Sequence, residues 1–149
     1  MPSNCFFWII DLAKDVTERR EIVRTVDRVM RVGLRVGIGR RGTALLETRG
    51  RHSGQLRVTP VTNGLDGAGF WIVAEHGLRS DYVRNLLAEP HVRVNADGQW
   101  RTGVAHVVRE DPLVRLDRIA AINPHARANI SIVRRSATDL RVIRVDLDD

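Results

Sequence analysis

Lysine and cysteine are nearly absent from this chain of 149 residues, and aromatic residues are few. Lys14 is the only lysine among 24 basic residues, so almost every cation is an arginine, whose planar fork suits phosphate and carboxylate groups. The single cysteine, Cys5, excludes a disulfide framework and is expected to be a small apolar filler. Aromatic residues make up 5% of the chain, too few for the stacking platform of a nucleic-acid-binding barrel. We therefore expect no nucleic-acid partner.

Long apolar runs and metal-ligand spacings are also missing. The apolar run at residues 5–10 is too short to span a bilayer, and no small-residue cleavage pattern follows it, so we expect a cytoplasmic protein. The five histidines show no spacing such as H-x-x-x-H, which predicts no metal site. With 43% hydrophobic and 28% charged residues, the composition is typical of one globular domain and excludes a disordered chain.

The excess of positive charge lies at the N-terminus. Residues 1–41 hold nine basic and five acidic residues, a net charge of +4, and residues 42–149 hold fifteen and thirteen, a net charge of +2. From residue 15 to residue 36 apolar side chains recur every three or four positions with arginines between them, which predicts an amphipathic helix. We expect this helix to pack on the domain with its basic face in solvent. The alternative is peripheral contact of the helix with the inner face of a membrane.

After residue 42 the pattern changes to short strands separated by glycine-rich turns. Strands are predicted at 43–49, 55–63, 70–74, 92–96, 100–109 and 140–147, and short helices at 80–89 and 111–122. Asp97-Gly98 is the strongest hairpin signal, and Pro60 marks the second strand as an edge strand or a bulge. Many short strands with few helices favour a mainly β fold, an antiparallel barrel over residues 42–149, rather than a nucleotide-binding βαβ sheet.

The turn at residues 50–54 carries the densest set of polar groups. Its two glycines allow a sharp turn that exposes backbone N–H groups, and Arg51, His52, Ser53 and the nearby Arg57 add side-chain donors. Backbone donors surrounded by charge-assisted side-chain bonds are what an anionic ligand needs. The alternative is an ordinary glycine-bracketed hairpin with solvated arginines.

Three stretches of the sequence together resemble one family. Residues 44–60 (ALLETRGRHSGQLRVTP) are similar to an apolar strand followed by T-x-G-R-[KRH]-[ST]-G and then R-x-x-P. Residues 70–74 (FWIVA) resemble the family's central strand, and residues 82–92 (YVRNLLAEPHV) its W-x-x-N-L-x-A-N-P-x-V segment. The closing residues 137–144 (ATDLRVIR) are similar in character. These motifs resemble the deazaflavin (F420)-dependent nitroreductase and quinone-reductase family.

The resemblance implies a split antiparallel β-barrel of the flavin-reductase type with an N-terminal helix and short covering helices. It also implies an oxidoreductase that transfers a hydride from reduced coenzyme F420 to a quinone-like or other hydrophobic small-molecule acceptor. In this family an arginine turn holds the phosphate and the oligoglutamate tail of the coenzyme, and it corresponds to residues 51–53 and Arg57 of this chain. The end of the central strand, at residues 73–76, would lie beside the ring system of the coenzyme. The short helix at residues 81–85 would cover the ring system from the other side. The implied cofactor-binding residues are Arg51, His52, Ser53 and Arg57, then Val58, Thr59, Pro60, Val61 and Thr62, then Val73, Ala74, Glu75 and His76, and finally Asp81, Tyr82, Val83, Arg84 and Asn85.

The chain departs from the family on the acceptor side. Tyr82 stands where tryptophan is usual, and Glu75 takes a place often held by a small polar residue. No aromatic residue follows Trp100, whereas nitro-reducing members have tyrosines there. Two alternatives stay open: a barrel that binds flavin mononucleotide (FMN) at the same turn, and a non-catalytic barrel that stores a cofactor or holds an acyl chain.

Overall fold

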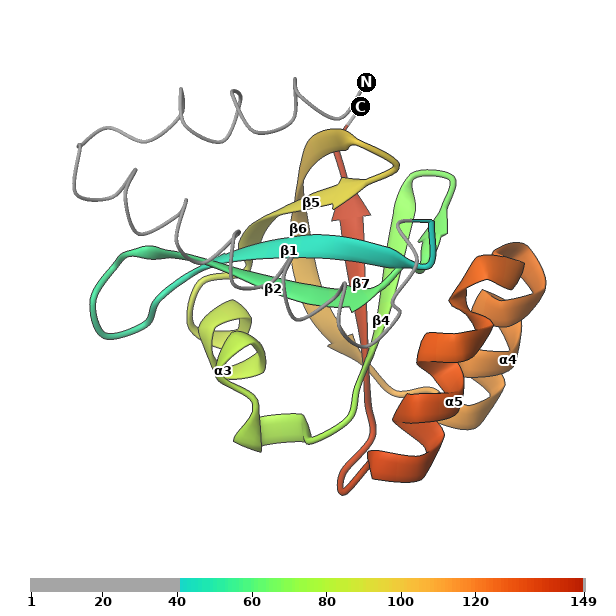
Figure 1. Cartoon of the computed structure of the whole chain (residues 1–149). Helices are drawn as coiled ribbons and strands as arrows, with labels where there is room; N and C mark the ends of the chain where they lie inside the picture. Colours follow the sequence, from blue (N-terminus) through green and yellow to red (C-terminus); the bar gives the residue numbers. More distant parts are fainter. Residues whose placement is uncertain (1–40, 149) are drawn as a thin grey trace.

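The computed structural model describes residues 41–148, and its centre is one antiparallel sheet of seven strands (Figure 1). The strand order is β2-β1-β5-β6-β7-β4-β3. The predictions for residues 1–40, including the amphipathic helix and its membrane contact, lie outside the described residues. The strands are β1 (Thr43–Arg49), β2 (Leu56–Thr62), β3 (Leu65–Asp66), β4 (Gly69–Ala74), β5 (His91–Ala96), β6 (Gln99–Val108) and β7 (Arg141–Leu147).

Local sequence explains the hairpin that joins β5 to β6. Asp97 and Gly98 both adopt positive φ angles, 57° and 85°. A two-residue type I′ turn requires positive φ at both central residues, and this turn type matches the right-handed twist of the strands that it joins. Ala96 pairs with Gln99 on either side of the turn, so the predicted hairpin is confirmed.

The sheet curls until its edge strand β2 contacts β4 (Figure 1). Among the described strands β2 pairs with β1, and β4 pairs with β7 and β3, so no ladder joins β2 to β4. The contact between β2 and β4 is therefore an open seam, the split of the barrel. Pro60 lies in this edge strand, which has a ladder on one side only, as the edge-strand prediction from its sequence position expected.

Apolar side chains fill both sides of the sheet. Inside the curl, fully buried residues such as Phe70 and Leu46 form the main core, and α3 (Asp81–Ala88) closes one end with Val83 and Leu86. On the outside, Leu116 of α4 (Pro112–Ile122) packs with the inward residues of α5 (Arg127–Ser136) against β4 and β7. Two short 3-10 helices, η1 (Gly77–Arg79) and η2 (Pro124–Ala126), precede α3 and α5.

The predicted fold class, mainly β with a split antiparallel barrel and short covering helices, is confirmed. Helix α4 begins at Pro112 because Asp111 is its cap and accepts a bond from the N–H of Leu113 at 2.9 Å. Ser80 occupies the N-cap position of α3 at the start of the predicted helix, although its side chain makes no capping bond.

Helix α5 was not predicted from the sequence. Its residues RANISIVRRS are rich in β-branched and small polar side chains, which favour strands and turns. The signal was the helical spacing of Ala126, Ile130 and Val133, which are buried against the sheet.

Candidate functional site

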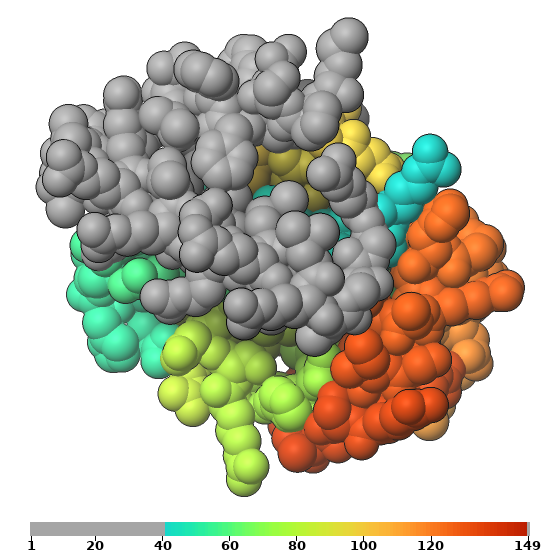
Figure 2. Space-filling view, in the orientation of Figure 1, coloured from blue at the N-terminus to red at the C-terminus, as the bar shows by residue number. Residues whose placement is uncertain are grey.

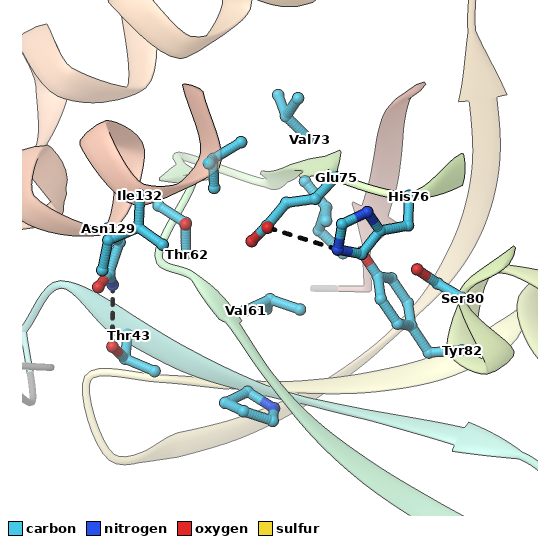
Figure 3. A pocket seen from close by; sticks show the side chains of 13 residues that line it. Thr43, Val61, Thr62, Val73, Glu75, His76, Ser80, Tyr82, Asn129 and Ile132 are labelled. Atoms are coloured by element: carbon cyan, nitrogen blue, oxygen red, sulfur yellow. Dashed lines mark hydrogen bonds and ion pairs between the residues drawn. The ribbon is translucent and has the colours of Figure 1, made fainter. Parts of the chain in front are cut away.

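A cavity of about 290 Å³ lies at the seam between β2 and β4, under α5 (Figure 3). Figure 2 shows the yellow-green surface of η1 and α3 facing the red surface of α5 across a narrow gap. Strands β2 and β4, the segment after β4, the start of α3 and helix α5 all contribute to the walls. The lining residues are Thr43, Pro60, Val61, Thr62, Ile72, Val73, Glu75, His76, Ser80, Tyr82, Asn129, Ile132 and Val133.

Glu75 and His76 are the ionisable groups at the end of β4, and their side chains face one another in the cavity (Figure 3). Glu75 Oε2 accepts a hydrogen bond from Ser136 Oγ at 2.6 Å and lies 3.8 Å from His76 Nε2. His76 Nδ1 lies 3.0 Å from Oγ1 of Thr138. Side chains from the end of α5 and from the following loop thus fix both groups.

Tyr82 enters the same cavity from α3 (Figure 3). Burial, and after it the negative charge of Glu75, raise the pKa of the Tyr82 hydroxyl above its usual range. The phenol therefore keeps its proton and remains a hydrogen-bond donor. Neutral Tyr82 and the carboxyl group of Glu75 make one side of the cavity polar, and Thr62 and Asn129 add polar groups at the other. Val61, Ile72 and Val133 make the walls between them apolar.

Asn129 ties α5 to the start of β1. Its Nδ2 donates to the carbonyl oxygen of Gly42 at 2.8 Å and to Thr43 Oγ1 at 3.0 Å. A Cβ at Gly42 would collide with the carbonyl of His125, so only glycine allows this close approach. These contacts hold α5 over the seam.

The predicted arginine turn lies between β1 and β2, but its backbone donors are bonded otherwise than expected. Three of its N–H groups, and that of the following Gln55, are used within the fold: Gly50 bonds to Gln55 O, Arg51 to Asn85 Oδ1, Gly54 to Gly50 O, and Gln55 to Ser53 Oγ. The prediction that the turn exposes its backbone donors is wrong for Gly50, Arg51 and Gly54. The reason is that the turn closes on itself at Gly54, where φ is +70°, and that Asn85 of α3 accepts the bond from Arg51.

Arg51 joins this turn to α3. Its Nη1 donates to the buried Asn85 Oδ1 at 2.9 Å, and its Nη2 lies 3.2 Å from the exposed carboxylate of Asp81. The guanidinium therefore anchors the helix that carries Tyr82 into the cavity.

The other predicted site residues fall into three groups. Pro60, Val61, Thr62, Val73, Glu75, His76 and Tyr82 line the cavity. Val83 and Ala74 belong to the main core, and Val58 lies in a separate apolar cluster with Leu45, Leu56 and Trp100. Exposed positions are held by His52, Ser53, Arg57, Asp81 and Arg84, whose Nε donates to Leu78 O.

Strand alternation gives Arg57, Thr59 and Val61 a common face of β2. This row runs from the turn toward the cavity and covers about 13 Å at the usual rise per residue. Asn85, buried in α3, lies at the end of the row near the turn. Arg57, Thr59 and Val61 thus form one path from the turn to the cavity, whereas Val58, Ala74 and Val83 lie away from it.

Six cavity residues were not predicted: Thr43, Ile72, Ser80, Asn129, Ile132 and Val133. Three of them come from α5, whose helical character was not recognised in the sequence. Thr43 and Ile72 are ordinary strand residues, and only the curl of the sheet brings them together. Ser80 is the first residue of the helix predicted at 80–89.

Between residues 41 and 148 no three His, Cys, Asp or Glu side chains are grouped so that they could hold a metal ion. None of the helices in that range is long and apolar enough to cross a membrane.

Comparisons with known proteins agree with this architecture. The chain shares its fold with an F420-H2 dependent reductase, FDR-A (19% identity, TM-score 0.52, 70% of this chain and 94% of that one). It is also similar to HutZ, described as a heme storage protein from Vibrio cholerae (18% identity, TM-score 0.52, 73% and 83% covered). No significant match exists among curated protein sequences. The model of the F420H2-dependent quinone reductase family matches residues 19–147. The chain belongs to the family of F420H2-dependent quinone reductases.

Proposed function

We propose that this protein binds reduced coenzyme F420 along β2 and catalyses hydride transfer to a quinone-like or other hydrophobic electrophile in the seam cavity. The observation that carries the proposal is the path that joins the cavity to the basic turn. Apolar walls with polar groups at the ends suit an aromatic ring system, and Arg57 lies at the other end of the path, beside the turn that carries His52.

The size of the cavity supports this division of the ligand. Sites for whole small molecules span about 300–1,000 Å³, so a cavity of about 290 Å³ is large enough for a ring system but not for a complete coenzyme. An anionic tail would have to lie outside it, along the face of β2 that carries Thr59 and Arg57. The residues present therefore fit a ligand with a flat head and an anionic tail.

The bound coenzyme would supply the hydride, and the chain would supply position and a dry environment. Helix α5 and Tyr82 cover the cavity, which limits water beside the reacting atoms. The Tyr82 hydroxyl is a donor that orients a carbonyl oxygen of the acceptor or of the ring. Holding two reactants in one geometry removes much of the entropic cost of their encounter.

A pair of fluorescence titrations tests the proposal. The purified chain is titrated separately with oxidised F420 and with FMN, and reduced F420 is then offered with menadione as a neutral quinone. We expect micromolar or tighter binding of F420, weaker binding of FMN, and oxidation of the reduced coenzyme that depends on the protein. Equal or reversed affinities would assign the protein to FMN, and F420 binding without turnover would make it a non-catalytic carrier.

A further inference from the structure

If the cavity is the site of the proposed hydride transfer, on which this inference rests, the acceptor that receives the hydride there also needs a proton. Hydride addition to a neutral carbonyl-type acceptor leaves negative charge on its oxygen. The apolar walls at Val61, Ile72 and Val133 cannot neutralise that charge. Tyr82 is a poor proton source because burial and the charge of Glu75 raise its pKa.

His76 lies between the reaction cavity and solvent. It lines the seam cavity, and it also lines a second cavity formed with Leu78, Arg79, Thr138 and Asp139. Its side chain is 45% exposed. A side chain that touches both spaces can take a proton from water on one side and release it on the other.

The imidazole is held by groups that leave one nitrogen available. Nδ1 lies 3.0 Å from Thr138 Oγ1, within hydrogen-bond distance. Nε2 lies 3.8 Å from Glu75 Oε2, too far for a hydrogen bond but close enough for a carboxylate to attract an imidazolium. Nε2 can therefore bond to a third group in the cavity. Ser136 Oγ donates to this same carboxylate oxygen at 2.6 Å and so fixes its position.

The backbone around this pair is also fixed. The carbonyl of Glu75 accepts bonds from the N–H groups of Thr138 and Asp139, at 2.9 and 3.0 Å. His76 forms an isolated β-bridge with Asp139. Gly77 adopts a φ of +48° and lies so close to Asp139 that a Cβ at this position would collide with the Asp139 side chain. The imidazole is thus set on a segment bonded to the loop before β7, which is the kind of support that a proton donor needs.

The charged and titratable groups around His76 come from four segments. Glu75 precedes it at the end of β4, Tyr82 faces it from α3, Arg79 approaches from η1, and Asp139 approaches from the loop before β7. Asp139 is itself paired with Arg141 at 3.2 Å. Glu75 is the carboxylate that lies in the seam cavity together with the imidazole.

We propose that His76 delivers the proton to the reduced acceptor and that Glu75 is its positioning residue. The hydride, with its electron pair, forms the new bond to the acceptor and reduces it by two electrons. The N–H bond at Nε2 breaks, its proton joins the acceptor oxygen, and the ring keeps the electron pair as neutral imidazole. Water then returns a proton to His76, and the one proton that oxidation of a bound coenzyme would release balances it in solvent.

Four variants test this assignment: His76→Gln and Glu75→Gln, with His91→Gln and Glu89→Gln as controls. The controls form a second histidine–glutamate pair, 2.6 Å apart, outside the cavity. We measure the dissociation constant of oxidised F420 by fluorescence, and kcat and KM with reduced F420 and menadione. His76→Gln should lower kcat about a hundredfold or more, the usual contribution of a general acid, with the dissociation constant within about threefold. Glu75→Gln should lower kcat by about tenfold without changing KM, because it acts through His76. The control variants should match the parent.

Chemical rescue adds a second measurement. Imidazole added to His76→Ala should restore part of kcat, because the cavity left by the side chain opens to both spaces. The inference is overturned if His76→Gln keeps kcat within about threefold, if imidazole does not restore His76→Ala, or if His76→Gln loses coenzyme binding. A parent chain that neither binds F420 nor oxidises its reduced form would instead refute the proposed function itself.

Discussion

The substitution Arg51→Ala tests whether this arginine supports α3, as the structure indicates. Its guanidinium donates to the buried Asn85 Oδ1 at 2.9 Å and lies 3.2 Å from the exposed Asp81. The exposed pair is worth about 0–1 kcal/mol, and a hydrogen bond from a charged donor about 1.5–3 kcal/mol. Because Asn85 Oδ1 keeps its bond from the Arg51 backbone N–H, it is not left without a donor. We therefore expect the lower end, a loss of about 1.5 kcal/mol in the free energy of unfolding.

Thermal unfolding followed by circular dichroism measures this loss. For a chain of this length about 1.5 kcal/mol lowers Tm by about 3–6 °C. A double-mutant cycle with Asn85→Ala should give a coupling energy of about 1 kcal/mol, since the two side chains are in contact. Arg118→Ala, at an exposed arginine of α4, is the matched control and should change Tm by less than about 2 °C. An Arg51→Ala protein that melts with the parent and shows no coupling would refute the anchoring role.

Three further predictions follow from the same geometry. Tyr82 is the only tyrosine in the sequence, so the absorbance of tyrosinate reports on it alone. Because the pKa of Tyr82 is raised, the native chain should show no phenolate at the ordinary tyrosine pKa of about 10. Glu75→Gln should lower the pKa of Tyr82 without restoring the ordinary value, since burial is the larger cause. As pH rises, the phenol ionises first in the unfolded chain, so its contribution to the free energy of unfolding is complete below about pH 10 and is lost as pH rises toward the raised pKa of the folded chain. Tyr82→Phe should remove this alkaline loss of stability. A native chain in which Tyr82 ionises near pH 10 would contradict the burial argument. Gly77→Ala should cost more stability than Gly67→Ala, because both have positive φ but only a Cβ at Gly77 meets Asp139; equal Tm losses would exclude that contact. Arg57→Ala should weaken F420 binding about tenfold or more, with a smaller dependence of the affinity on salt, and a dissociation constant within about twofold of the parent would remove Arg57 from the path.

Sequence reasoning succeeded where local chemistry decides conformation. The Asp97-Gly98 turn accepts positive φ at both residues, Asp111 before Pro112 starts a helix, and alternating side chains give strands such as β7. The motifs over residues 44–60 and 82–92 then predicted the family, because they combine glycines, arginines and an asparagine at fixed spacing. Each of these signals lies within a few neighbouring residues.

The tertiary structure decided the rest. Helix α5 forms because Ile130 and Val133 gain burial against β4 and β7, which outweighs the weak helix preference of β-branched residues. The cavity exists because the curl of the sheet brings β2 and β4 together without pairing them to each other, with α5 held over the opening by Asn129. Arg51 bonds to Asn85, 34 positions away, and His76 faces Thr138, 62 positions away. The sequence by itself determined the six longer strands, helices α3 and α4, the Asp97-Gly98 hairpin and the family, because those depend on residues that are close in the chain. The positions of donors and acceptors in the cavity depend on contacts between distant segments, and only the folded chain sets those distances.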